Sequence, residues 1–381
     1  MLASQIKTDK NIKINAIAYK SHKTPLSLQE LYIPYDGESK VKPNEILVEI
    51  KATSINPVDV ILKAYTYAWY GPKYKIMGGD FAGVVLEAGS ETAYKPGARV
   101  YGDVLDIGKR GSFSSKILVD PSKLVVCEKI PEGMSFEQAG SLGIVSNTAY
   151  KAMTKYKGDL KGKNVLVLGA GTSVGFFSTQ FAKNYFGAAN VVATCSSKSA
   201  AKTTKAGADL TIDYSKGDSS KLNSLLEFVK VNGYFDLIVD TVRDEFVIDH
   251  FSSLLKPAKE GGMFAQVSGS YVIDYSDIHF YNMLPSWKII KNKLKFKLSL
   301  SKYPILPVWA EPDTEYGKAI EQLWNEGKLQ IVLDSVYDAY KDYQIAADKV
   351  ASCKAQGKVV LSWEQEQGDN WFSSRGAISF N

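Results

Sequence analysis

The chain has 381 residues, of which 45% are hydrophobic and 23% are charged, and its formal net charge is +5. This length predicts two domains, and the composition is that of a globular protein, which excludes a fibrous or intrinsically disordered chain. The charge excess is too small to indicate a nucleic acid-binding protein. No stretch approaches the ~20 apolar residues of a membrane span.

The cysteines Cys127, Cys195 and Cys353 are far apart and form no CxxC pair. Three separated cysteines argue against a disulfide framework and fit a reducing compartment, so we expect a cytoplasmic location. Residues 1–20 carry no apolar segment of the signal-peptide type, but their lysines and scarcity of acids leave an organelle-targeting role open.

The first third of the chain is rich in short apolar or alternating runs, separated by Gly, Pro and Asp clusters. These runs predict the strands of a small β-barrel, at residues 14–19, 46–52, 83–88 and 117–119.

From Phe136 onward, apolar strands alternate with helical periodicity. We expect strands at 163–168, 190–194, 211–212, 235–240 and 263–268, and helices at 176–186, 200–206, 222–229, 246–255 and 314–326. Such alternation predicts an α/β fold, in which crossover helices cover both faces of a doubly wound parallel sheet.

The string VLVLGAGTSVGFF is the most informative motif. A buried strand ends at Gly169, and Gly171 and Gly175 follow where a helix starts. Such glycines allow a tight turn and a close approach to phosphate, and the helix start offers free N–H groups to a pyrophosphate. The motif predicts a dinucleotide site; a tight turn without a ligand is the alternative.

The next strand end indicates which dinucleotide binds. An NAD site usually has an Asp or Glu about 20 residues after the glycines, to accept from the ribose 2′-hydroxyl. No acid lies between Ala170 and Ala208, where Ser196, Lys198 and Lys202 stand instead. Hydroxyl and ammonium groups suit a 2′-phosphate, so we expect NADPH; a solvated helix face is the alternative for the lysines.

The chain resembles the zinc-free medium-chain dehydrogenase/reductase superfamily, in its quinone oxidoreductase-like branch. The resemblance rests on ATSINPVDV, GGDFAGVVLEAG, GARVYG, GAGTSVGFFSTQFAK, FDLIVDTV and GKVVL, in the family's order. It is similar to a fungal group that has been linked to mitochondria and lipid droplets.

This resemblance implies a GroES-like β-barrel catalytic domain split into 1–134 and 322–381, around a Rossmann domain at 135–321. It also implies an NADPH-dependent enzyme that transfers hydride to a quinone or an α,β-unsaturated carbonyl, and a homodimer or a monomer.

The family's cofactor contacts carry over to matching positions. Around the pyrophosphate they are Gly169, Gly171, Thr172, Ser173, Val174 and Gly175; at the 2′-phosphate they are Ser196, Lys198 and Tyr214. Around the rest of the cofactor they are Thr148, Val242, Ser268, Gly269 and Lys358. Two positions depart from the family: Thr172 replaces the central glycine and is expected to narrow the turn, and Arg243 replaces the glycine that usually follows Val242.

Zinc is not expected. The metal ligands of the alcohol dehydrogenase branch match Asn56, Gly79 and Ile144 here, which are not zinc ligands. Asp59 and Asp80 belong to family motifs; we interpret Asp59 as a helix cap and Asp80 as a local hydrogen-bonding group.

The catalytic candidates are Asn56, expected to face the nicotinamide, and Tyr65 and Tyr67 as proton donors. Some relatives have a Tyr or Lys where this chain has Ile61, and protonation from water needs no side-chain donor. Two alternatives stay open: a cofactor-binding but non-catalytic membrane-associated or trafficking protein, and an enoyl-thioester reductase.

Residues 271–312 form an aromatic and lysine-rich insert. It fits a cap over the substrate pocket, a solvated connection, or an interfacial helix on anionic lipid, which would give peripheral membrane or lipid-droplet contact.

Overall fold

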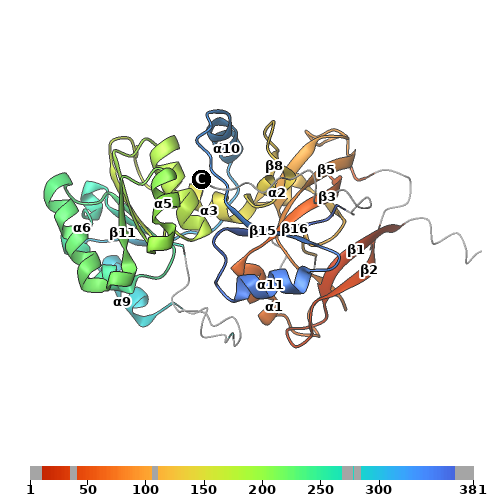
Figure 1. Cartoon of the computed structure of the whole chain (residues 1–381), viewed down its shortest axis with the longest axis horizontal. Helices are drawn as coiled ribbons and strands as arrows, with labels where there is room; N and C mark the ends of the chain where they lie inside the picture. The colour runs from red at the N-terminus through yellow and green to blue at the C-terminus, as the bar shows by residue number, and fades with distance from the viewer. Residues whose placement is uncertain (1–10, 35–40, 105–109, 268–277, 279–284, 365–381) are drawn as a thin grey trace, which may run out of the picture.

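The computed structural model describes residues 11–34, 41–104, 110–267, 278 and 285–364. Figure 1 shows two halves, a strand-rich half that carries β1, β2, β3 and β5 and a half in which helices surround a sheet. Among the described residues, no helix is long and apolar enough to cross a membrane.

The strand-rich half contains the first eight strands and the last two. They are β1 (Asn11–Tyr19), β2 (Ser27–Pro34), β3 (Ile46–Ile55), β4 (Lys75–Ile76), β5 (Asp80–Ala88), β6 (Arg99–Asp103), β7 (Lys116–Val119), β8 (Val126–Lys129), β15 (Leu333–Asp338) and β16 (Lys358–Ser362). One sheet has the order β15-β16-β3-β5-β6-β8 with β7 beside β3, and a second has the order β2-β1-β4. Because β16 pairs antiparallel with β3, both ends of the chain build this domain.

The other half is a six-stranded parallel sheet. Its strands are β9 (Asn164–Leu168), β10 (Asn190–Cys195), β11 (Leu210–Asp213), β12 (Leu237–Asp240), β13 (Met263–Gln266) and β14 (Ile305–Pro307). Their order β11-β10-β9-β12-β13-β14 is that of a Rossmann sheet, in which a ligand crosses the carboxyl ends of the first and fourth strands. The predicted fold class is confirmed.

Eleven α-helices lie within the described residues. They are α1 (Pro57–Ala64), α2 (Phe136–Ala139), α3 (Gly143–Thr154), α4 (Ser173–Gln180), α5 (Ser197–Lys205), α6 (Asp218–Asn232), α7 (Glu245–Asp249), α8 (Phe251–Leu254), α9 (Trp287–Lys297), α10 (Tyr316–Asn325) and α11 (Tyr343–Ala351).

The core explains why β9 is apolar at each of its last four positions, Val165 to Leu168. Val165 and Val167 belong to a cluster on one face of the sheet, and Leu166 and Leu168 belong to a cluster on the other. Because helices cover both faces of the sheet, neither face of the strand contacts water. The strand therefore lacks the alternation of apolar and polar residues that a half-exposed strand shows.

Several boundaries differ from the predicted ones. The predicted helix 176–186 is α4 followed by a π-helical turn, and the predicted helix 246–255 divides into α7 and α8. The expected domain boundary at 321/322 lies inside α10, whose Ile320 and Leu323 share a core cluster with β9.

Candidate functional site

The turn after β9 requires glycine at positions 169 and 175, where the backbone passes too close to its neighbours for a side chain. Gly169 has φ +80°, and a Cβ there would lie 2.2 Å from Val242 Cγ1. A Cβ on Gly175 would lie 2.3 Å from the Gly169 carbonyl oxygen. A larger residue at position 175 would therefore push α4 away from the end of the strand, and one at position 169 would collide with Val242.

Thr172 closes this turn through its side chain. Its hydroxyl donates to the Gly169 carbonyl at 2.9 Å and accepts from the Gly175 N–H at 3.0 Å. These bonds make Thr172 the N-cap of α4. The Thr172 hydroxyl thus caps the helix, which the side chain of a glycine could not do.

The start of α4 offers donors to an anion. The backbone N–H groups of Gly171, Ser173 and Val174 have no acceptor among the described residues. They lie at the positive end of the helix dipole, at the carboxyl end of the sheet. This cradle fits the pyrophosphate of a dinucleotide.

The ends of β10 and β11 bring the three predicted 2′-phosphate residues near one another. The strands are paired with Cys195 opposite Asp213, so Ser196 and Tyr214 leave the sheet side by side. Ser196 is the N-cap residue of α5, and Lys198 is exposed in its first turn. Tyr214 is 52% exposed.

Asp213 is an acid that lies beyond the acid-free span 170–208 and belongs to the neighbouring strand β11. Its carboxylate accepts from the Ser215 N–H at 2.9 Å, and hydrogen bonds from Ser215 lower the pKa of Asp213. Lys202, by contrast, donates to the Gln356 carbonyl at 2.9 Å, and burial lowers its pKa.

Arg243 keeps the backbone shape of the glycine it replaces. Its φ is +60°, in the left-handed region that favours glycine. The buried carboxylate of Asp240 accepts from the N–H groups of Val242 and Asp244, at 3.0 and 3.1 Å, and burial raises the pKa of Asp240 to about 6. The segment that carries Val242 is therefore fixed beside Gly169.

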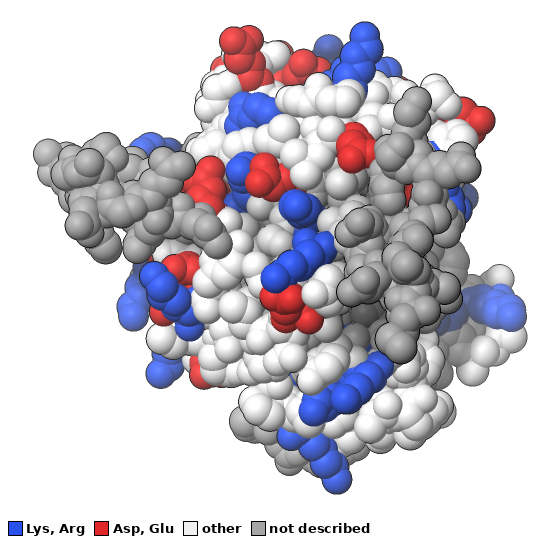
Figure 2. Space-filling view, turned by 90° about the vertical axis from the view of Figure 1, so that its right-hand side faces the viewer, with Lys and Arg blue, Asp and Glu red and all other residues white. Residues whose placement is uncertain are grey.

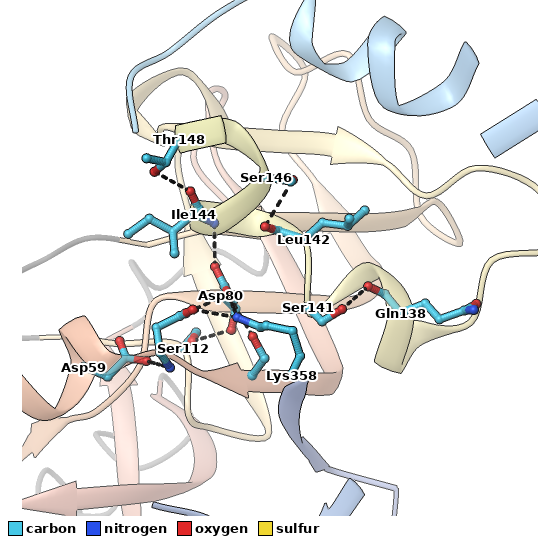
Figure 3. Close-up of polar contacts among 12 residues, drawn as sticks. Asp59, Asp80, Ser112, Gln138, Ser141, Leu142, Ile144, Ser146, Thr148 and Lys358 are labelled. Carbon is cyan, nitrogen blue, oxygen red and sulfur yellow. Dashed lines mark hydrogen bonds and ion pairs between the residues drawn. The ribbon is translucent and has the colours of Figure 1, made fainter. Parts of the chain in front are cut away.

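A second group of predicted residues lies in a buried polar cluster where the domains meet (Figure 3). Lys358 Nζ donates to Asn56 Oδ1 at 2.6 Å and lies 3.3 Å from Asp80 Oδ2. The same Asp80 oxygen accepts from Asn56 Nδ2 at 2.7 Å and from Ser54 Oγ at 2.8 Å. Its other oxygen accepts from the Ile144 N–H at 2.8 Å.

Two more carboxylates surround this cluster. Asp59 accepts from the Asn56 N–H at 2.7 Å, as expected for a residue at the start of α1, and burial raises its pKa to about 7. Burial, with the charges of Asp80 and Asp59, raises the pKa of Asp103 well above its ordinary value. Lys358 is thus the cation among three buried carboxyl groups.

The residues at the three zinc-ligand positions do not fit a catalytic zinc. Asn56 is bonded to Lys358, Ile144 contributes only its backbone N–H, and a Cβ on Gly79 would lie 2.7 Å from Asp103 Oδ1. None offers a thiolate or imidazole. Within the described ranges, no three His, Cys, Asp or Glu side chains are placed to hold a metal ion.

The tyrosine candidates lie at the far end of α1. Asn56 and Tyr65 flank this helix, which at 1.5 Å per residue separates their backbones by roughly 13 Å. Tyr67 is an exposed residue that stacks on Trp69 at 6.1 Å and meets His22 edge-on at 5.0 Å. The structure therefore does not bring the tyrosines into the Asn56 cluster.

Thr148 is a buried residue of α3 whose hydroxyl donates to the Ile144 carbonyl at 2.7 Å. Ser268 and Gly269, predicted beside the nicotinamide, lie outside the described residues.

Family models match both domains. Residues 42–132 match the alcohol dehydrogenase GroES-like domain, and residues 206–361 match the zinc-binding dehydrogenase family. The fold is similar to the quinone oxidoreductase from Coxiella burnetii, with a TM-score of 0.71 and 20% identity over 93% of this chain and 100% of that one. A Rossmann sheet with this turn, joined to a GroES-like barrel, defines a medium-chain dehydrogenase/reductase.

Relatives among yeast proteins narrow the class. Protein YIM1-2 of Lachancea thermotolerans is 30% identical over 359 residues, covering 92% of this chain and 97% of its own. Protein YIM1 of Saccharomyces cerevisiae is 27% identical over 368 residues, covering 93% and 99%. The chain belongs to the YIM1 family of this superfamily, whose members' names state no reaction.

Proposed function

We propose that the chain is an NADPH-dependent, zinc-independent oxidoreductase that reduces a quinone or an α,β-unsaturated carbonyl. The observation that carries the proposal is the set of free N–H groups after Gly169, with the Ser196, Lys198 and Tyr214 side chains on the adjacent strand ends. Membership of an oxidoreductase superfamily supports it.

Each group has a distinct task at this edge of the sheet. The Gly171, Ser173 and Val174 N–H groups would bind the pyrophosphate. Lys198 would neutralise the 2′-phosphate and Ser196 would donate to it. Asp213 accepts a hydrogen bond from Ser215 but remains an anion, so Lys198 must also offset the charge of Asp213 for a 2′-phosphate to bind here.

The residues at the zinc positions favour an acceptor that needs no Lewis acid. A bound NADPH would supply a hydride, which with a proton from water reduces a quinone or a conjugated C=C bond. Such acceptors already delocalise the incoming charge, unlike a plain ketone. The Asn56 amide is held by Lys358 and Asp80, so it can orient a neighbouring group without shifting its own position.

Turnover tests this proposal. We expect the purified chain to oxidise NADPH faster than NADH with quinones or enals. The rate should not fall after chelation, and metal analysis should find no stoichiometric zinc. Reduction of enoyl thioesters, lost in Tyr65→Phe or Tyr67→Phe, would favour an enoyl-thioester reductase instead.

Saturable NADPH binding without turnover of any acceptor would indicate a non-catalytic cofactor-binding protein. Zinc-dependent turnover of simple alcohols would overturn the proposal.

A further inference from the structure

Helix α9 carries an exposed apolar ridge, which we define as Trp287, Ile290, Leu294 and Leu298. Trp287 is 73% exposed and Leu294 is 53% exposed. At 3.6 residues per turn, residues 287, 290 and 294 fall within an arc of roughly 60°. Leu298 continues the ridge at the end of the helix. The ridge therefore points as a unit into solvent.

The opposite face of α9 fixes this orientation. Ile289 is buried in a core cluster with Phe251 and Ile305. Ser286 caps the helix by accepting from the Ile289 N–H at 3.3 Å, and Lys288 forms an ion pair with Asp249 at 2.7 Å. The apolar ridge is thus exposed on a helix that is held in place.

Lysines border the ridge on both sides. On a helical projection, Lys291 and Lys295 lie on one side and Lys293 and Lys297 lie on the other. None of the four has an ion-pair partner in the described part of the chain, and no acid occurs in residues 285–301. By contrast, Figure 2 shows basic and acidic side chains intermixed on the face of the other domain.

We propose that α9 docks on the surface of a membrane that contains anionic lipids. The ridge would enter the boundary between headgroups and acyl chains, and the long lysine side chains on both sides would reach the lipid phosphates. This inference does not depend on the proposed redox function.

The shape and charge of α9 favour lipid over protein partners. If α9 of a second copy packed on this face, the four lysines of one helix would face the four lysines of the other and repel them. A helical partner protein docks in a groove, whereas α9 presents a convex ridge. A fluid anionic surface can accept both the ridge and the lysines.

Vesicle flotation of the full chain tests the proposal. We expect binding to vesicles of phosphatidylcholine with phosphatidylserine, weaker binding at high salt, and little binding to phosphatidylcholine alone. Leu294→Glu should abolish the binding. Val231→Glu is the matched control, because Val231 is a residue of α6 that is 82% exposed, and it should bind like the wild type.

The lysines are tested separately. Lys291→Gln with Lys295→Gln should weaken vesicle binding by about fivefold for each lysine. Lys230→Gln on α6 should leave it unchanged. Thermal melting of each variant checks that the fold is kept, which is expected because all these side chains are exposed.

Absence of wild-type binding to the anionic vesicles, or equal binding by Leu294→Glu, would overturn the proposal. Dissociation of a soluble oligomer by Leu294→Glu, without vesicle binding, would assign the ridge to a subunit contact instead.

Discussion

At the scale of single residues, the buried charged groups beside Asn56 make the stability of the fold depend on which carboxyl groups hold a proton. Lys358 lies among the three carboxyl groups of Asp59, Asp80 and Asp103, all nearly inaccessible to water. One ammonium group cannot compensate three negative charges in this environment. The cluster is therefore stable only when some of the carboxyl groups hold a proton, as the raised pKa values of Asp59 and Asp103 indicate.

Replacing Asp59 with Asn should change the pH dependence of stability. The pKa of Asp59 is about 7 in the folded chain and ~4 when unfolded, so the folded state binds more protons in this window. The free energy of unfolding therefore falls as pH rises from ~4 to ~7, by as much as about 4 kcal/mol from this group. Denaturant melts across this range should show a flatter profile for Asp59→Asn.

The control for this prediction is Asp348→Asn, which removes an exposed carboxylate on α11. It should melt with the wild-type pH profile. Parallel profiles for Asp59→Asn and the wild type would contradict the role assigned to Asp59.

Sequence reasoning found some of these residues but not their contacts. Asn56 and Lys358 are recognisable from family motifs, yet their hydrogen bond joins positions 302 residues apart, which no local pattern encodes. Asp103 carries no motif, and only the fold shows that it fills the space beside Gly79. Asp213 is 18 residues away from Cys195 along the chain, and only the pairing of β10 with β11 places it opposite Cys195.

At the scale of elements, the unit formed by β9, the turn and α4 defines the nucleotide-binding site. An apolar strand, two glycines without room for a Cβ and a threonine cap specify one close packing of helix on strand. The pattern of apolar residues and glycines predicts the strand, the turn and the start of the helix from the sequence alone. It does not predict the capping role of Thr172, because that role depends on the side-chain rotamer inside the turn.

Gly169→Ala should disrupt this unit. The substitution adds backbone strain at φ +80° and a clash with Val242, so we expect a loss of about 3 kcal/mol in the free energy of unfolding and loss of nucleotide binding. Gly327→Ala separates the two causes, because Gly327 has φ +65° and nothing within 4 Å of a Cβ. It should cost about 1 kcal/mol. Equal losses in denaturant melts would contradict the predicted clash.

The element that sequence reasoning left most open is α9. Its composition allowed a cap, a connection or an interfacial helix. Helical spacing alone does not tell which face of a helix meets the core. The burial of Ile289 settles which side chains point outward.

At the scale of the whole molecule, the two domains are joined through the site itself. Ile144, at the start of α3, donates to Asp80 of β5, and Lys202 of α5 donates to Gln356 before β16. Figure 1 shows the late strand β16 beside β3, with β15 on its other side, so the chain returns to its first domain after completing the second. The cofactor edge and the Asn56 cluster are thereby held in one assembly.

The most direct test of this account is a fluorescence titration of the full chain with NADPH and with NADH. The account predicts saturable binding of one NADPH per chain, about tenfold tighter than NADH, with the difference lost in Lys198→Ala because one charge-assisted contact to the 2′-phosphate disappears. No saturable NADPH binding, or equal affinity for the two cofactors in the wild type, would contradict it.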